Sequence, residues 1–287
     1  MPPAIQAILL GTAQDGGVPQ AGCQCAACAA AWVDPSQRRL VSALGLVDRA
    51  AGAAFMIDAT PDFREQLHHL QTAAPGLPLA GLLLTHAHIG HYTGLIHLGY
   101  EAMATRGLPV YGTRRMLAFL REHAPWRQLV DQGQVALHEL TPGVWRPLTP
   151  NLAVQPLLVP HRDEWSDTVG YVVGGPRRHL LYLPDIDSWE AWARPPFARG
   201  VREVVAGVDA ALLDGTFYAD GELPGRDLHA IGHPWVTDTL AALGDQAGKV
   251  TLIHLNHTNP LLRAGPERQA VEGPGLRVGQ EGTVWEL

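Results

Sequence analysis

The most informative segment of this sequence is an apolar run that ends in three closely spaced histidines, Leu79-Ala80-Gly81-Leu82-Leu83-Leu84-Thr85-His86-Ala87-His88-Ile89-Gly90-His91. The continuous apolar stretch Leu79–Leu84 predicts a strand buried on both faces. In an extended chain residues i and i+2 point the same way, so His86 and His88 project from one side of the strand end. His91, at the start of the next turn, can fold back toward them. Three converging imidazoles suit zinc or iron. The alternative is a solvated surface loop that holds histidines by chance.

Predicted strands and helices alternate on both sides of this segment. Strands are expected at Ala4–Leu10, Ala43–Val47, Ala53–Ile57, Pro109–Tyr111, Ala210–Leu213 and Val250–Leu255, with β-rich stretches at Val144–Pro160 and Thr168–Leu183. Helices are expected at Pro61–Ala74, Thr93–Arg106, Arg114–Gln132 and Val236–Leu243. Two series of strands, each followed by helices, predict an α/β (α+β) fold: an αββα sandwich of two mixed sheets packed face to face. Because no repeat or long linker interrupts the chain, residues 1–287 are expected to form a single domain.

The overall composition narrows the class of partner. The chain has 287 residues, of which 46% are hydrophobic and 17% charged, as in a globular protein. A net charge of -7 disfavours a nucleic-acid binder, because a phosphate backbone needs a basic face. We find neither an apolar stretch of membrane-spanning length nor a signal sequence. We therefore expect a cytoplasmic protein that acts on a small-molecule substrate, with no nucleic-acid or membrane partner; a homodimer stays open.

The three cysteines of the chain, Cys23, Cys25 and Cys28, lie within six residues of one another. An odd number at this spacing does not suit a disulfide framework, whereas it does suit a metal knuckle. A structural zinc needs four ligands, and His257, three residues after His254, is the candidate for the fourth. The alternatives are small buried hydrophobes for the cysteines and an ordinary surface position for His257.

The segment His86-x-His88-x-Gly90-His91 resembles the HxHxDH signature of the metallo-β-lactamase superfamily. The cysteine knuckle and the HxxH pair resemble one branch of it, the PqqB/PhnP-like proteins of quinone-cofactor biosynthesis and phosphonate breakdown. Similar stretches recur along nearly the whole chain, at Leu10–Ala13, Gly16–Gln20, Pro61–Arg64, Leu213–Phe217 and Asn256–Pro260.

This resemblance implies two kinds of metal site. At the active site it implies one or two ions of zinc, iron or manganese. His86, His88 and His161 would hold the first ion, Asp185 would bridge, and His91 and His254 would hold the second. Beside it, a structural zinc would be held by Cys23, Cys25, Cys28 and His257. One position departs from the pattern: residue 90 is Gly, where the signature has an aspartate ligand. Gly90→Asp is therefore predicted to raise the metal occupancy of the second position.

The favoured function is a metal-dependent hydrolase, in which metal-activated water attacks an ester, phosphodiester or lactone. Asp185 would orient the water, and His233 is the candidate general acid or substrate contact, with a solvent-facing loop histidine as the alternative. Asp58 and Asp214, each at a strand end, are candidates to brace the metal-binding histidines, with a turn-forming role as the alternative for Asp58.

Two other functions stay open. The set His91, Asp185 and His254 contains two histidines and one carboxylate, which suits a non-haem iron-dependent oxygenase. A non-catalytic metal-binding protein, whose centre has decayed through Gly90, is the third.

Overall fold

The structure is a computed structural model that describes residues 5–223, 225 and 231–287, and its strands form two seven-stranded sheets. The first sheet holds β1 (Ile5–Gly11), β2 (Ala43–Asp48), β3 (Ala53–Ile57), β4 (Leu79–Leu83), β5 (Leu108–Gly112), β6 (Val135–Glu139) and β14 (Val284–Glu286). The second holds β7 (Arg146–Pro147), β8 (Ala153–Val159), β9 (Thr168–Gly174), β10 (His179–Leu183), β11 (Ala210–Asp214), β12 (Val250–Ile253) and β13 (Arg277–Val278). Ala4, the predicted start of the first strand, lies outside the described residues.

Both sheets are mixed, as predicted. The first has the order β14-β1-β2-β3-β4-β5-β6, antiparallel up to β3 and parallel from β3 to β6. The second has the order β13-β12-β11-β10-β9-β8-β7, antiparallel from β7 to β10 and parallel from β10 to β13. Strands β8, β10, β11 and β12 therefore run in one direction, and their carboxyl ends share one rim.

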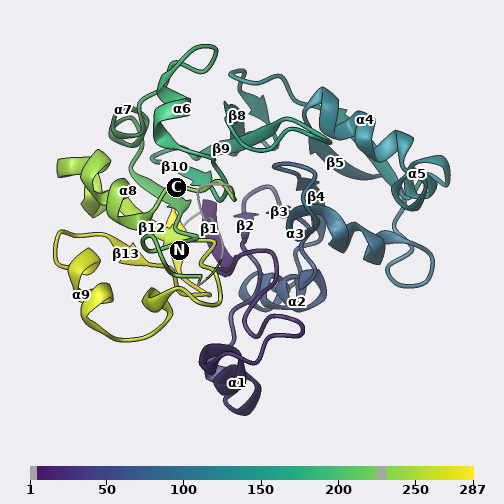
Figure 1. Ribbon diagram of the computed structural model, residues 1–287. Coiled ribbons are helices and arrows are strands. Elements are labelled where there is room, and N and C mark those ends of the chain that lie inside the picture. The colour runs from purple at the N-terminus through teal and green to yellow at the C-terminus, as the bar shows by residue number, and fades with distance from the viewer. Residues whose placement is uncertain (1–4, 224, 226–230) are drawn as a thin grey trace.

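Helices cover the outer face of each sheet (Figure 1). The α-helices are α1 (Ala26–Val33), α2 (Phe63–Ala73), α3 (Ile89–Tyr92), α4 (Arg114–Glu122), α5 (Ala124–Asp131), α6 (Trp189–Ala193), α7 (Val201–Ala206), α8 (Val236–Leu243) and α9 (Pro266–Glu272). Short 3-10 helices are η1 (Pro35–Gln37), η2 (Thr93–Leu98), η3 (Gly244–Lys249) and η4 (Pro260–Leu262). No helix in the described ranges combines the length and apolar character needed to span a bilayer.

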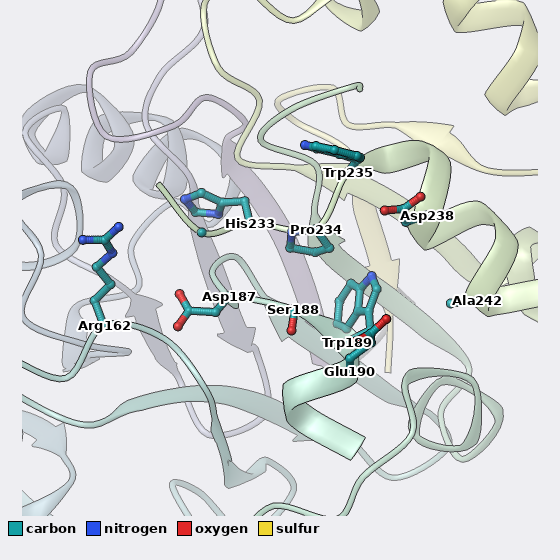
Figure 2. Close-up of a pocket in the computed structure, with 11 residues that line it drawn as sticks. Arg162, Asp187, Ser188, Trp189, Glu190, His233, Pro234, Trp235, Asp238 and Ala242 are labelled. Carbon is teal, nitrogen blue, oxygen red and sulfur yellow. The ribbon is translucent and has the colours of Figure 1, made fainter. Parts of the chain in front are cut away.

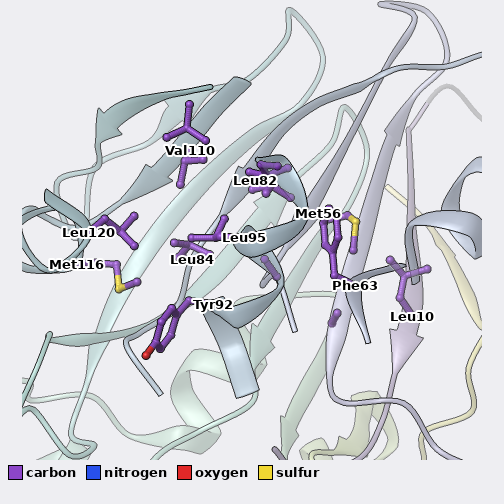
Figure 3. Packing of buried hydrophobic residues seen from close by; sticks show 14 of the residues in the cluster. Leu10, Met56, Phe63, Leu82, Leu84, Tyr92, Leu95, Val110, Met116 and Leu120 are labelled. Atoms are coloured by element: carbon purple, nitrogen blue, oxygen red, sulfur yellow. The ribbon is translucent and has the colours of Figure 1, made fainter. Parts of the chain in front are cut away.

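Three apolar layers hold the sandwich together. The middle layer joins the facing sides of the two sheets, where Leu9 and Phe55 of the first sheet belong to one cluster with Tyr171 of the second. The outer face of the first sheet packs on α2, η2 and α4, and Figure 3 shows Met56 and Leu82 of that face with Phe63 and Met116 from the helices. A third cluster joins the second sheet to α6, α7 and α8. Burial on both faces of each sheet explains the continuous apolar runs of the central strands, and the αββα prediction is confirmed.

Two predicted helices are wrong in extent. Only Thr93–Leu98 of the segment 93–106 is helical, as 3-10 helix, and the chain becomes extended at Gly99. Gly94 holds this segment against the loop after β3, since a Cβ at Gly94 would lie 2.3 Å from the Thr60 carbonyl oxygen. The predicted helix 114–132 is two helices separated by His123, which is extended. Pro125 accounts for the break, because it lacks an N–H and its ring excludes the carbonyl four residues earlier.

Candidate metal centre

The strand ends at one rim of the sandwich bring together the six residues that the sequence singles out for the active site. His86 and His88 follow β4, His161 follows β8, Asp185 follows β10, His254 follows β12, and His91 lies in α3. Five of them are nearly fully buried, and His88 is half-buried. Residues separated by more than 160 positions therefore meet at one point.

The first group contains His86, His88 and His161, which offer ring nitrogens within 4.8 Å of one another. His161 Nε2 lies 3.3 Å from His88 Nδ1 and 3.7 Å from Asp185 Oδ1. Asp187 contacts the other ring nitrogen of His161, Nδ1, at 3.1 Å. Nε2 of His161 is thereby directed toward the other histidines.

The second group contains His91, Asp185 and His254, together with Asp15 from the loop after β1. Asp185 Oδ2 lies 2.9 Å from His91 Nε2 and 3.2 Å from His254 Nε2. Burial would raise the pKa of the Asp185 carboxyl, but the rings of His254, His161 and His91 hold it well below the usual value. Asp185 is therefore a carboxylate, the form that binds a cation.

Asp58 braces the histidine loop, and one of its contacts fixes the tautomer of His91. Its Oδ2 lies 2.8 Å from His91 Nδ1, while its Oδ1 accepts hydrogen bonds from the backbone N–H and the hydroxyl of Thr85, both at 2.9 Å. The Thr85 hydroxyl lies in turn 3.0 Å from His86 Nδ1. With Nδ1 engaged in both rings, Nε2 is the atom left for a metal ion.

Asp214 orients histidine rings on the opposite side of the centre, as Asp58 does on the first side. Its Oδ2 lies 2.7 Å from His233 Nδ1, and its Oδ1 accepts a hydrogen bond from the Thr216 hydroxyl at 2.7 Å. That hydroxyl lies 2.9 Å from His254 Nδ1. Burial disfavours the imidazolium of His233, but Asp214 and then Asp185 raise its pKa to about 9. His233 Nδ1 lies 3.7 Å from Asp185 Oδ1, and His233 belongs to neither of the two ligand groups described above.

The donor atoms have the spacing that a metal ion needs, and several of them lack hydrogen bonds. Tetrahedral zinc with nitrogen or oxygen ligands at 2.0–2.1 Å places those ligands about 3.4 Å apart, and the contacts around Asp185 span 2.9 to 3.8 Å. Three buried atoms here, His86 Nε2, His91 Nε2 and Asp185 Oδ2, make no hydrogen bond among the described residues. His91 Nε2 and Asp185 Oδ2 are 2.9 Å apart, but with the proton of His91 on Nδ1 both atoms are acceptors. Such atoms each cost about 1–3 kcal/mol when nothing satisfies them. A bound cation would satisfy all three.

The cysteine knuckle spans the end of the loop after β1 and the first turn of α1, which contains Cys28. His257 Nδ1 lies 3.6 Å from Cys23 Sγ and 3.5 Å from Cys25 Sγ, and Cys28 completes the group. A tetrahedral zinc with one nitrogen and three sulfur ligands would place these atoms about 3.6 Å apart. Burial opposes ionisation of Cys25, but the Cys28 backbone and His257 outweigh it and lower the pKa of this thiol to about 6. The four atoms can hold one zinc ion.

A cavity of about 750 Å³ opens beside the centre, and His233 forms part of its wall (Figure 2). Asp187, which contacts the ligand candidate His161, lines the same cavity together with Trp189 and Trp235. A second cavity, of about 680 Å³, reaches the centre at Asp15 and His88 and is walled by aromatic residues, among them Trp165. The second cavity reaches the ligand candidate His88 directly, whereas the first reaches the edge of the centre at His233.

Asp15 is the one residue of the centre that the sequence does not reveal. Its Oδ1 lies 3.2 Å from His91 Nε2 and 3.3 Å from His254 Nε2. Burial would raise the pKa of Asp15, but His254 and His91 hold it well below the usual value. Asp15 lies in a glycine-rich loop, where the sequence has no strand or helix periodicity that would indicate which side chains face the centre. The one available hint was the glycine at position 90, which leaves the motif short of a carboxylate.

Comparisons with known proteins identify the family and the fold. A family model described as beta-lactamase superfamily domain matches residues 54–255. Coenzyme PQQ synthesis protein B of Methylobacterium nodulans is 31% identical and that of Methylobacterium radiotolerans 30%, each over 99% of this chain and 100% of the relative. The crystal structure of Zn²⁺-bound PqqB from Methylobacterium extorquens superposes with a TM-score of 0.80 at 25% identity, over 98% of this chain and 100% of that one. A diphosphatase from the PhnP family has the same fold, with a TM-score of 0.71 at 23% identity over 99% and 97%.

The fold is that of the metallo-β-lactamase superfamily, and the chain belongs to it. Within that superfamily it is a member of the family of coenzyme PQQ synthesis protein B, which confirms the resemblance seen in the sequence.

Proposed function

We propose that this protein is a metal-dependent hydrolase that cleaves an ester, phosphodiester or lactone. The observation that carries the proposal is the convergence of four buried histidines and one carboxylate at a rim flanked by cavities, with unpaired Nε2 atoms directed inward. A bound divalent ion would lower the pKa of a coordinated water and polarise the bond to be cleaved.

Each residue of the centre would have a distinct role in this reaction. His86, His88 and His161 would hold the main ion, and His91 and His254 would hold a second one, with Asp185 between the two groups. Asp185 would also accept a hydrogen bond from the attacking water and orient it. Asp58 and Asp187 contact Nδ1 of His91 and of His161, and these contacts fix the orientation of the two rings so that Nε2 of each faces the centre.

His233 is proposed as the general acid. It lines the larger cavity, and Asp214 orients its ring from behind through a 2.7 Å contact with Nδ1. A histidine placed in this way can give a hydrogen bond or a proton to the oxygen that leaves the substrate. We further propose that the chain acts as one domain on a small-molecule substrate and that the knuckle holds a structural zinc.

An iron-dependent oxygenase is the second candidate. The close set of His91, Asp185 and His254, with contacts of 2.9 and 3.2 Å to the same carboxylate oxygen, contains the two histidines and one carboxylate that non-haem iron uses. The relatives named as coenzyme synthesis proteins keep this candidate open.

Metal analysis of protein purified without added metal, combined with turnover assays, tests the proposal. We expect zinc or manganese, and hydrolysis of a bis-aryl phosphodiester, an aryl ester or a lactone. His86→Ala should abolish turnover and weaken the active-site ion by more than about tenfold, whereas His69→Ala, on the exposed side of α2, should change neither. If the purified protein contains iron and consumes oxygen, the oxygenase proposal replaces the hydrolase proposal. No turnover of any substrate, with unchanged stability in His86→Ala, would leave a non-catalytic metal-binding protein.

A further inference from the structure

Gly90 and Asp15 occupy one small volume beside His91. A Cβ atom built on Gly90 would lie 2.2 Å from Asp15 Oδ1, 2.5 Å from its Cγ and 2.8 Å from its Cα. Any side chain at position 90 would therefore overlap the carboxylate and press on the backbone of residue 15. The two positions cannot both carry a side chain in this arrangement.

The backbone of the loop after β1 keeps Asp15 in this place. The N–H of Gln14 donates to the Leu255 carbonyl at 3.0 Å, and the Leu255 N–H donates to the Thr12 carbonyl at 2.9 Å. The N–H of Gly17 donates back to Gln14 at 2.7 Å and closes the turn that contains Asp15. The residue before Asp15 is thus hydrogen-bonded to the residue that follows His254, so the backbone of the loop itself places Asp15 beside the histidines.

From these contacts we infer that Asp15 is a metal ligand that replaces the carboxylate missing at position 90. Its Oδ1 lies 3.2 Å from His91 Nε2 and 3.3 Å from His254 Nε2, so it faces the same point as those two nitrogens and Asp185. The second metal position then has two imidazoles and two carboxylates, all from described residues. This inference deepens the proposed function, on which it rests for the presence of a metal centre.

The inference reverses the sequence-based prediction for Gly90→Asp. Introduced alone, the new side chain would collide with Asp15, so we expect a lower melting temperature and no gain in metal. Combined with Asp15→Gly, which removes the obstruction, it should restore the ion that Asp15→Gly loses.

The experiment compares zinc and Co²⁺ binding by the whole chain and its variants. Asp15→Asn keeps the size of the side chain but removes its charge, and we expect about one ion fewer per chain, or a Kd for that ion raised by at least about tenfold. The visible absorption of the Co²⁺-loaded chain, which reports coordination geometry, should change as well. Asp131→Asn, an exposed carboxylate on α5, is the matched control and should behave as wild type.

Two outcomes overturn the inference: wild-type metal content, affinity and Co²⁺ spectrum in Asp15→Asn, or a double variant that binds no more metal than Asp15→Gly. The Asp15→Asn comparison stands even if Gly90→Asp fails to fold. Hydrolysis is measured in parallel. If the wild type hydrolyses substrate and Asp15→Asn binds metal as the wild type does, Asp15 is not a ligand but the hydrolase proposal stands. If Asp15→Asn loses an ion but the wild type hydrolyses nothing, Asp15 is a ligand and the hydrolase proposal fails.

Discussion

At the scale of single residues, the centre depends on which nitrogen of each imidazole is free. His86, His91 and His254 all have Nδ1 engaged, by Thr85, Asp58 and Thr216, and all present Nε2 to the centre. A neutral imidazole has one N–H and one lone pair, so an acceptor at Nδ1 places the lone pair on Nε2. These partners therefore determine which nitrogen each ring offers to a metal ion.

Asp58→Asn tests this dependence. The asparagine oxygen can still accept from the Thr85 backbone N–H, but its amide would present a donor to His91 Nδ1, which is already a donor. We expect the affinity for the active-site ion to fall about 10- to 100-fold, measured by competition with a chelator. Asp131→Asn serves again as the control, and equal affinities in the two variants would show that Asp58 does not set the tautomer.

At the scale of elements, the sequence predicts the sheets better than the helices. Strands buried on both faces, such as Leu79–Leu83, carry their signal in local composition. The end of a helix depends on single residues, and Pro125 and Gly99 stop helices that periodicity alone extends. Asp15 escapes prediction for a different reason: its partners His91 and His254 are distant in sequence, and only the packing of the loop after β1 on the end of β12 brings them together.

One contact between elements should make stability depend on pH. Glu281, just before β14, accepts a hydrogen bond from the backbone N–H of Leu40 at 2.7 Å. Burial raises its pKa to about 7, and Asp62 and Glu65 add to the effect. A carboxyl group whose pKa is higher in the folded chain favours folding when protonated, so this stabilisation is present below about pH 4.5 and is lost as pH rises through about 7.

Glu281→Gln removes that titration. Relative to wild type, the variant should gain about 1–2 kcal/mol in free energy of unfolding between pH 5 and pH 8, less than the full shift implies because the side chain is partly exposed. Urea unfolding of both proteins at the two pH values, at constant metal concentration, measures the difference. A gap that stays constant, or narrows toward pH 8, contradicts the assignment.

At the scale of the whole molecule, the knuckle joins segments from opposite parts of the chain. Cys23 and Cys25 precede α1 and Cys28 lies in its first turn, whereas His257 follows β12. A zinc ion here would tie Cys23 and Cys25 to a residue that is 234 and 232 positions away in the sequence. Structural zinc contributes its binding free energy to folding directly. The knuckle also lies close to the candidate metal centre, because His254 lies three residues before His257.

His257→Ala should release about one zinc per chain and lower the melting temperature, while the active-site ion stays bound. Zinc counting and thermal unfolding measure the two effects, and His69→Ala is the control. If the variant keeps both its zinc content and its melting temperature, the knuckle does not hold a structural ion.

The pairing of Asp15 with His254, and of the knuckle cysteines with His257, has a consequence for how the protein matures. Neither ligand set is complete until β12 and the residues after it have been synthesised and β12 has taken its place beside β11. Contacts this distant in sequence also form late in folding, because a long loop must close first. Any ion that these ligands hold would therefore bind only after β12 has paired, and a nascent chain stalled before β12 would carry three unprotected thiols.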